Sequence, residues 1–453
     1  MNKKTTPQPI DNTHFFPATA AMAKNYDNQA NNTWLSNYRR SHIAKLEQAI
    51  FPHSRVEHFK YNRLHALGNK DFSRCLPTNT TWQDIRSNLR LIDGLDEQKQ
   101  TQTRQQTQHA ERVAMVDGRF SSELSRLKRC RVTTFADADT AQQKKIIAML
   151  QSQGVEHNPF IVLNEALSDN GVLVEIDENS SGGVLEVLEI MTPATVNQTV
   201  ARQLLIDVAD NSKTTVIARV ITWEQQQTDT ALSTQRSIIN IGRNAHFTHY
   251  HLQLENPHSV HFGSVTYNLQ SHAQLKAFHA ATGSSLKKID ITVNHVGQYA
   301  SASLNGLYVA TDDQQVDYHT SVNHPLPNGT TDENFRGIIN GAAEGVFNGR
   351  IYIAQDAQKT LAQLSNKNLL LSDDAVIHTK PELEIYADDV VCSHGATVSR
   401  MDDRSLNYML ARGISKGEAE LMLSFAFFNE ILQELEHESV ANYIRPILFK
   451  RFE

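Results

Sequence analysis

The chain has 453 residues and a formal net charge of −7, from 43 lysines and arginines against 50 aspartates and glutamates. A net negative chain has no electrostatic reason to bind nucleic acid or an anionic membrane, so a protein or a small ligand is the expected partner. The three cysteines, Cys75, Cys130 and Cys392, are too few and too widely spaced for a disulfide framework, which indicates a reducing compartment.

The N-terminal third has weak helical patterns. Apolar residues recur at helical intervals over 20–50, more weakly over 82–95, and clearly over 140–151. Residues 96–112 offer almost nothing apolar to bury and predict a solvated loop or frayed helix. No apolar run of signal-peptide length begins the chain, and no stretch of ~20 apolar residues follows, so we expect a cytoplasmic protein.

The period changes to that of strands after residue 158. In GVLVEID, Val172, Val174 and Ile176 share one face, and similar alternation continues through short segments up to Arg400. Turns ending at Ala245, at Ala273 and at residue 300 recur at intervals of 28 and 27 residues, whereas those ending at 357 and 375 lie 18 apart. This loose repeat favours a β-solenoid, although a β-sandwich would show the same alternation.

Helical patterning returns after residue 401. Asp402 or Asp403 can cap a helix through Leu410, and Gly413 can end it. Ser415 and Glu418 then form an S-x-x-E capping box, followed by a helix with an apolar stripe. The stripe comprises Leu421, Phe425, Phe428, Leu432 and Leu435. This surface either packs on the end of the β-core or, in part, binds another protein.

One tempting motif is Gly242, His249, His251, Glu255 and Gly263, which approximates the first metal-binding motif of cupins. The second cupin motif is missing, and other histidines lie nearby. We therefore interpret these histidines as solvent-facing side chains on a strand, with a metal site as the alternative.

Enzyme signatures are scarce. The sequence contains no phosphate-binding G-x4-GK[ST] loop, GxSxG elbow, HExxH or GxGxxG motif, so the chain itself should not hydrolyse ATP. The acidic segment 311–333 could serve a secreted carbohydrate-active β-solenoid enzyme, but its expected role is a solvated excursion.

The segment from Val376 to Ile414 is far more specific. It contains TKPELEIYADDV, CSHGATV and ARGI, and it follows GVFNGRIYI, AQKT and NKNLLLS in order. These motifs closely resemble the SufB/SufD family of iron-sulfur cluster assembly scaffolds, with weaker likeness over about 215–430. SufB-like chains tend to carry a VEHEATTS-type segment where this one has CSHGATVS, so the SufD branch is favoured and a SufB-like paralogue is the alternative.

Two positions depart from the family pattern. Leu361 and Leu364 stand where the resemblance leads us to expect Asp and Gln. Any polar role of this strand is therefore in doubt in this chain.

The resemblance implies a mainly β fold, with a right-handed parallel β-helix between two α-helical regions. We expect the boundaries 1–157, 158–400 and 401–453 for the helical region, the β-helix and the C-terminal helices. It further implies a non-catalytic scaffold that pairs with SufB and binds the ATPase SufC. The isolated chain could also pair with a second copy of itself.

The resemblance also suggests site residues. Cys392 and His394 lie two apart on a predicted strand, so both side chains should project from one face and could approach a nascent iron-sulfur cluster shared with SufB. A buried cysteine and a hydrogen-bonded histidine are the structural alternative. SufB pairing is expected around 380–398. SufC binding is expected on the last helices, near Ser415, Glu418, Phe425, Phe428 and Leu432.

Overall fold

The computed structural model describes most of the chain. The described residues are 15–27, 34–64, 67, 72–74, 111–151, 158–167, 171–178, 180–192, 195, 197–222, 231–255 and 258–451. The helix predicted over 82–95, and almost all of the loop predicted over 96–112, lie outside these residues.

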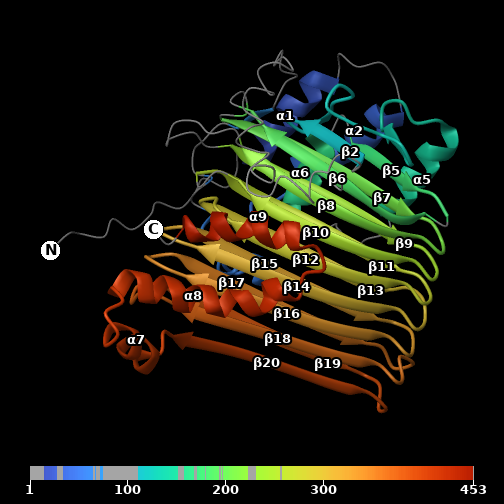
Figure 1. Cartoon of the computed structure of the whole chain (residues 1–453). Helices are drawn as coiled ribbons and strands as arrows, with labels where there is room; N and C mark the ends of the chain where they lie inside the picture. Colours follow the sequence, from blue (N-terminus) through green and yellow to red (C-terminus); the bar gives the residue numbers. More distant parts are fainter. Residues whose placement is uncertain are drawn as a thin grey trace.

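Two facing ten-stranded sheets form the core (Figure 1). From β5 onward, odd-numbered strands make one sheet, which also contains β4, and even-numbered strands make the other, which also contains β3, so the chain alternates between sheets. From β5 to β20, each strand pairs in parallel with the strand two ahead of it. Their bounds are β5 Val172–Ile176, β6 Ser181–Met191, β7 Gln198–Val208, β8 Lys213–Thr222, β9 Leu232–Ile241, β10 His246–Leu254, β11 Val260–Leu269, β12 Gln274–Thr282, β13 Leu286–His295, β14 Ser301–Ala310, β15 Gln315–His324, β16 Thr330–Ile339, β17 Glu344–Ile353, β18 Leu361–Leu370, β19 Val376–Ile385 and β20 Val391–Arg400. The predicted parallel β-solenoid is confirmed.

The coil geometry explains the loose repeat. Each coil has one turn before its even-numbered strand and another before its odd-numbered strand. Two residues occupy equivalent positions in successive coils when strand pairing aligns them. Gln274 aligns with Ser301, 27 positions later, and Thr330 with Leu361, 31 positions later. Ala357 precedes β18 and Ala375 precedes β19. Their short spacing therefore separates two different turns of the coil.

The predicted solvated excursion at 311–333 is wrong. β15 occupies its centre and β16 begins near its end, and both pair on each side with neighbouring coils. Asp317 is buried there and accepts a hydrogen bond from the Lys288 ammonium at 3.0 Å. The acidic residues suggested a solvated loop. An outward-facing carboxylate in a strand can, however, be paired by a basic residue of the adjacent coil, as Lys288 pairs Asp317.

N-terminal elements cover the outer face of the odd sheet. The helices are α1 Phe15–Asp27, α2 Trp34–Glu47, the 3-10 turn η1 Glu57–Phe59, α5 Thr140–Gln151 and α6 Pro159–Leu167. Short strands β1 Ser73–Arg74, β2 Glu111–Val116, β3 Arg119–Phe120 and β4 Cys130–Thr134 add to the two sheets. Phe160 of α6 stacks on Phe262 of β11 with ring centroids 3.5 Å apart, which anchors the helices to the solenoid.

The C-terminal helices cover the even sheet (Figure 1). They are α7 Asp403–Leu410, α8 Lys416–Gln433 and α9 Glu438–Phe449. Asp402 caps α7, and the Ser415–Glu418 capping box begins α8, as predicted. Apolar residues of α8 and α9 pack on five even strands, from Tyr250 on β10 to Leu369 on β18.

The space between the sheets is apolar over most of its length, yet it contains charged groups. Glu255 is completely buried and receives a hydrogen bond from the Lys287 ammonium at 2.6 Å. Burial opposes ionisation, but Lys287 and His261 outweigh it and lower the pKa of Glu255 to about 2. Lys287 also donates to two backbone carbonyls, so this buried charge is fully bonded.

Glu333 is the contrasting case. Its side chain is buried between the sheets, two residues from the core residue Phe335, and the nearby Thr320 hydroxyl does not offset that burial. Burial raises the pKa of Glu333 to about 8. The carboxyl group is therefore held mostly protonated at neutral pH in the folded chain.

This state of Glu333 predicts a pH-dependent cost. An unfolded glutamate ionises above about pH 4.3, whereas the folded one keeps its proton to about pH 8, so stability should fall as pH rises between these values. Glu333→Gln should therefore stabilise the chain by about 3 kcal/mol at pH 7 and leave it unchanged at pH 4. Urea unfolding at both pH values measures this. Exposed Glu434→Gln is the matched control. An equal effect of Glu333→Gln at both pH values would contradict the assignment.

Candidate functional site

The solenoid ends in a coil that is open on one side. β19 stands at the end of the odd sheet and β20 at the end of the even sheet. Each pairs with the preceding coil, and no other strand of the described chain lies beyond it. Every residue of β20 is exposed except the half-buried Cys392. The last coil therefore leaves the interior of the solenoid uncovered.

Cys392 and His394 lie on the inward face of this last strand. Parallel pairing aligns Cys392 with Ala362 and His394 with Leu364, and both of these partners belong to the core between the sheets. Cys392 packs against that core, whereas His394 is exposed. The predicted placement on one face is thus observed. A ligand role for either side chain stays a prediction.

The two residues differ chemically. Burial raises the pKa of the Cys392 thiol, so the isolated chain presents it protonated at neutral pH. A bound cation or a nearby positive charge would favour the thiolate. His394 lies one coil beyond Leu364 and two coils beyond Glu333 in the same column. His394 is therefore separated from Glu333 by the apolar Leu364 and is the polar residue at the open end of this column.

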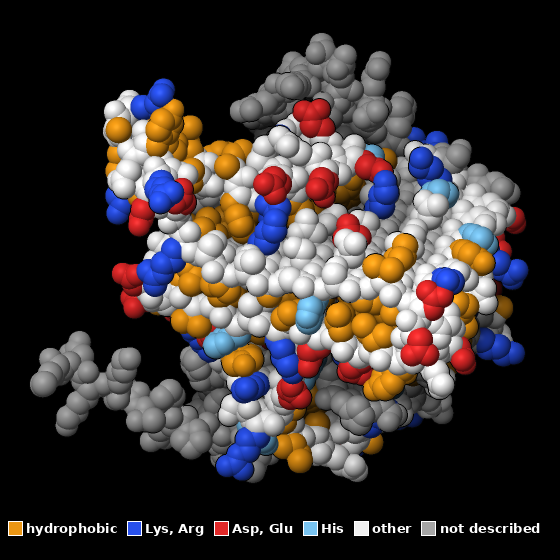
Figure 2. All heavy atoms as spheres, turned by 90° about the horizontal axis from the view of Figure 1, so that it is seen from below, with side chains coloured by type: hydrophobic (Ala, Val, Ile, Leu, Met, Phe, Trp, Pro, Cys, Tyr) orange, Lys and Arg blue, Asp and Glu red, His pale blue; other side chains and the backbone are white. Residues whose placement is uncertain are grey.

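Apolar side chains surround the open coil. The exposed ones, which we call the open-end surface, are Leu361, Val376, Ile385, Tyr386, Val391 and Val398. Val391 is 64% exposed and Tyr386 60% exposed. Figure 2 looks at the molecule from this end and shows hydrophobic side chains spread over it among backbone and polar atoms. Side chains of this type on an edge coil mark an interaction surface.

Charged pairs lie beside the open-end surface. Arg350 makes a bidentate pair with Glu384 of β19, at 2.6 and 2.9 Å. Lys380 contacts Glu382 at 2.7 Å and Glu57 at 2.5 Å. An apolar centre with charged groups at its edge is the usual anatomy of a protein interface.

The predicted partner-binding residues of α8 and its N-cap have three different settings. Phe428 and Leu432 are buried against the even sheet, so they hold the helix in place. Phe425 is half-buried and stacks on Phe449 of α9, with ring centroids 4.6 Å apart. Ser415 and Glu418 are exposed but bond to each other in the capping box. None of the three aromatic or aliphatic residues offers a fully free surface.

Other apolar residues of these helices do face solvent. Tyr408 is 60% exposed, Leu410 37% and Met422 54%. From the sequence, Leu410 marked only the end of a helix and Met422 only added apolar surface beside the stripe. None of the three was predicted to bind a partner, because helical periodicity identifies the stripe that packs inward. A helix pair with both a packed stripe and exposed apolar residues has surface left for another protein.

The cupin-like residues occupy the interior, so the prediction that they face solvent is wrong. His249, His251 and Glu255 are all buried between the sheets. His249 Nδ1 lies 2.6 Å from the Tyr267 hydroxyl, while His251 bonds to Gln253 at 2.7 Å. Burial lowers the pKa of His249 to about 3. These histidines are neutral members of buried hydrogen-bond networks.

The motif does not converge on one point either. Within the described part of the chain, three ligand atoms gather within 4.8 Å at a different place, formed by His58, Asp290 and His319. No sequence spacing pointed to that group, because its members lie on elements far apart in the chain.

The family model for the core domain of SufB and SufD, described as SUF system FeS cluster assembly, matches residues 190–427. This span is more than half of the chain and runs from the end of β6 into α8. The chain belongs to the SufBD family.

Individual relatives agree with this SufBD assignment. The iron-sulfur cluster assembly protein SufD of Escherichia coli is 27% identical over 424 residues, covering 92% of this chain and 93% of that protein. A SufBD family protein of Synechocystis is 28% identical over 350 residues, covering 74% and 77%. The SufD protein of Bacillus subtilis is 29% identical over 163 residues, covering 35% and 37%. These matches favour cluster assembly over the alternative of a carbohydrate-active enzyme.

The two departures from the SufBD pattern have different settings. Leu361 is 48% exposed and belongs to the open-end surface, whereas Leu364 is buried in the core. Gln363 between them faces outward and is exposed. The inward column of β18 is therefore apolar at the position just inside His394.

No helix in the described residues has the length and apolar character needed to cross a membrane.

Proposed function

We propose that this SufBD protein is a SufD-like scaffold subunit of a cytoplasmic cluster-assembly complex. It pairs through its open end with a SufB-like paralogue and recruits a SufC-like ATPase through its C-terminal helices. The observation that carries the proposal is the uncovered last coil, with exposed edge strands and exposed apolar side chains around it.

Backbone geometry favours a solenoid as the pairing partner. β19 and β20 are each ten residues long and regular, so each presents a row of unpaired amide and carbonyl groups along its outer edge. A second parallel coil can extend both sheets at once and cover the interior. A homologous chain has such a coil, and a second copy of this chain is the competing occupant.

Cluster chemistry would then occur between the two subunits. Cys392 and His394 supply a thiol and an imidazole, which are suitable ligands for iron or sulfur. The nascent cluster is cargo held transiently. ATP hydrolysis belongs to the ATPase partner, so the isolated chain has no turnover of its own.

Pairing is tested by placing charges on the open-end surface. Val391→Asp combined with Val398→Asp should weaken pairing with the SufB-like partner at least tenfold, because unpaired charges would be buried. Co-purification and light scattering measure the loss. Leu127→Asp, at an exposed apolar position between β3 and β4 in the N-terminal region, should have no effect. Undiminished pairing of the double variant, or pairing only between identical copies, would refute the assignment.

Cluster formation tests the two candidate ligands. His394→Ala, with Cys392→Ser as a second variant, should reduce cluster yield in the assembled complex at least tenfold while subunit ratio stays unchanged. The yield is measured by iron and sulfide content and by visible absorption. His272→Ala, at an exposed turn histidine, is the control. A normal yield in both variants, with the complex intact, would leave only a structural role.

ATPase recruitment is tested on the exposed residues of α7 and α8. Met422→Glu combined with Tyr408→Ser should abolish SufC-like binding and preserve open-end pairing, because neither side chain is buried in the chain itself. Pull-down with the ATPase measures binding. Deleting 401–453 is less informative, since it uncovers apolar residues of the even sheet. Full ATPase binding by the double variant would place that interface elsewhere.

A further inference from the structure

A short N-terminal segment lies across four successive odd strands. We call residues 57–63 the strap. His58 contacts Asp290 of β13, Asn62 donates to Asp317 of β15 at 2.7 Å, and Arg63 donates to Glu344 of β17 at 2.7 Å. On β19, His378 stacks on Tyr61 and Lys380 pairs with Glu57. The strap thus ties neighbouring coils together from outside.

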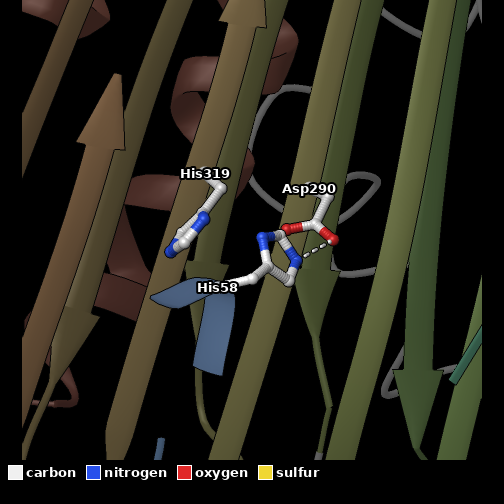
Figure 3. A group of neighbouring side chains, drawn as sticks. All are labelled: His58, Asp290 and His319. Carbon is white, nitrogen blue, oxygen red and sulfur yellow. Dashed lines mark hydrogen bonds and ion pairs between the residues drawn. The ribbon is translucent and has the colours of Figure 1, made fainter. Parts of the chain in front are cut away.

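Three potential ligands meet where the strap crosses β13 and β15 (Figure 3). His58 Nε2 lies 2.9 Å from Asp290 Oδ2, and the His58 and His319 ring centroids are 4.7 Å apart. The side chains of His58, Asp290 and His319 are 37%, 17% and 14% exposed. An ion could therefore reach the group, yet most of its surroundings are protein.

We propose that His58, Asp290 and His319 form a site for a divalent transition-metal ion that fastens the strap to the solenoid. Two imidazoles and one carboxylate are a donor set suited to Zn²⁺ and Fe²⁺. Donor atoms on one such ion stand roughly 3.3 Å apart when each bond is about 2.0–2.1 Å. His58 Nε2 and Asp290 Oδ2 stand at hydrogen-bonding distance, 2.9 Å, and all three donor atoms lie within 4.8 Å of one another. Ion binding would replace this hydrogen bond and requires an adjustment of the three side chains.

The protonation states suit this role. Burial lowers the pKa of His58, which leaves its imidazole neutral at pH 7. Burial opposes ionisation of Asp290, but the hydrogen bond from His58 and the charge of Lys288 outweigh it and hold the pKa of Asp290 below its usual range. The carboxylate is therefore charged without any metal.

Asp317 holds the His319 ring in place by contacting its Nε2 atom. One of its oxygens lies 3.1 Å from His319 Nε2, and this residue is almost completely buried. A histidine that donates one ring N–H to a carboxylate has its other nitrogen fixed in direction and made more basic, as in many metal sites. Asp317 is thus a positioning residue.

Lys288 is the competing cation. Its ammonium lies 3.5 Å from Asp290 Oδ1 and 3.0 Å from Asp317 Oδ2, whereas the two histidines contact the other oxygen of each carboxylate. Two carboxylates and one ammonium leave a local charge of −1 for the ion to neutralise. The site is therefore distinct from a fully neutralised ion-pair network.

Titration of the metal-stripped full chain with Co²⁺, followed by visible absorption, tests the proposal. The wild type should bind one ion here, and His58→Ala, His319→Ala and Asp290→Asn should each weaken binding at least tenfold. Asp317→Asn should weaken it about tenfold. Lys288→Met should strengthen it, because it removes a competing cation, whereas a merely structural ion-pair cluster would gain no affinity.

Controls separate this site from the open end. His272→Ala and the double variant Cys392→Ser, His394→Ala should keep wild-type Co²⁺ affinity for this site, even if cluster assembly fails. Hydrogen exchange in residues 57–63 should slow with Zn²⁺ in the wild type and not in His319→Ala. Absence of Co²⁺ binding by the folded wild type, or unchanged binding in both His58→Ala and His319→Ala, would overturn the site. The first of these two outcomes is measured on the wild type alone and so does not depend on variants folding.

Discussion

In-register parallel pairing between successive coils is the constraint on which the rest of the structure depends. Each strand satisfies its backbone only by lying beside the strand of the coil before and after it, so the same residue position recurs in one column of the sheet. Asn240, Asn268, Asn294 and Asn323 form such a column, with side-chain hydrogen bonds of 2.9 Å between neighbours. The same rule leaves the last coil without a partner within the described chain.

The neighbours of a charged residue in adjacent coils also determine whether its side chain is ionised. Inside, Glu255 keeps its charge because Lys287 lies nearby, whereas Glu333 lies in a column between Leu304 and Leu364 and keeps its proton instead. Outside, Asp290 and Asp317 share Lys288. Burying polar groups is costly unless they are bonded, so the stability of each coil depends on what the adjacent coil provides.

The flanking elements cover the faces of the two sheets and leave the end free. N-terminal helices and the strap lie on the odd sheet, and α8 and α9 lie on the even sheet. The strap reaches β19 through Glu57 and Lys380, so it connects the outer wall of the solenoid to the coil that we propose as the pairing surface. The metal site that we propose at the strap and the pairing surface that we propose at the end thus lie on nearby coils. The first uses imidazole and carboxylate groups, and the second uses backbone edges and apolar side chains.

The sequence by itself determined the strand-rich core, the helix caps at Asp402 and Ser415, and the shared face of Cys392 and His394, because alternation, capping and strand spacing are local properties. Alternation left a solenoid and a sandwich open, and the loose repeat and the motifs at 376–414 decided for the solenoid. It misplaced His249 and His251 and the strand at β15, since local pattern does not say which face of a coil points inward or which charge a neighbouring coil will pair. Only the tertiary structure brought His58 to Asp290, more than two hundred residues away. It also decided that Phe428 and Leu432 are core, because burial depends on which sheet the helix meets.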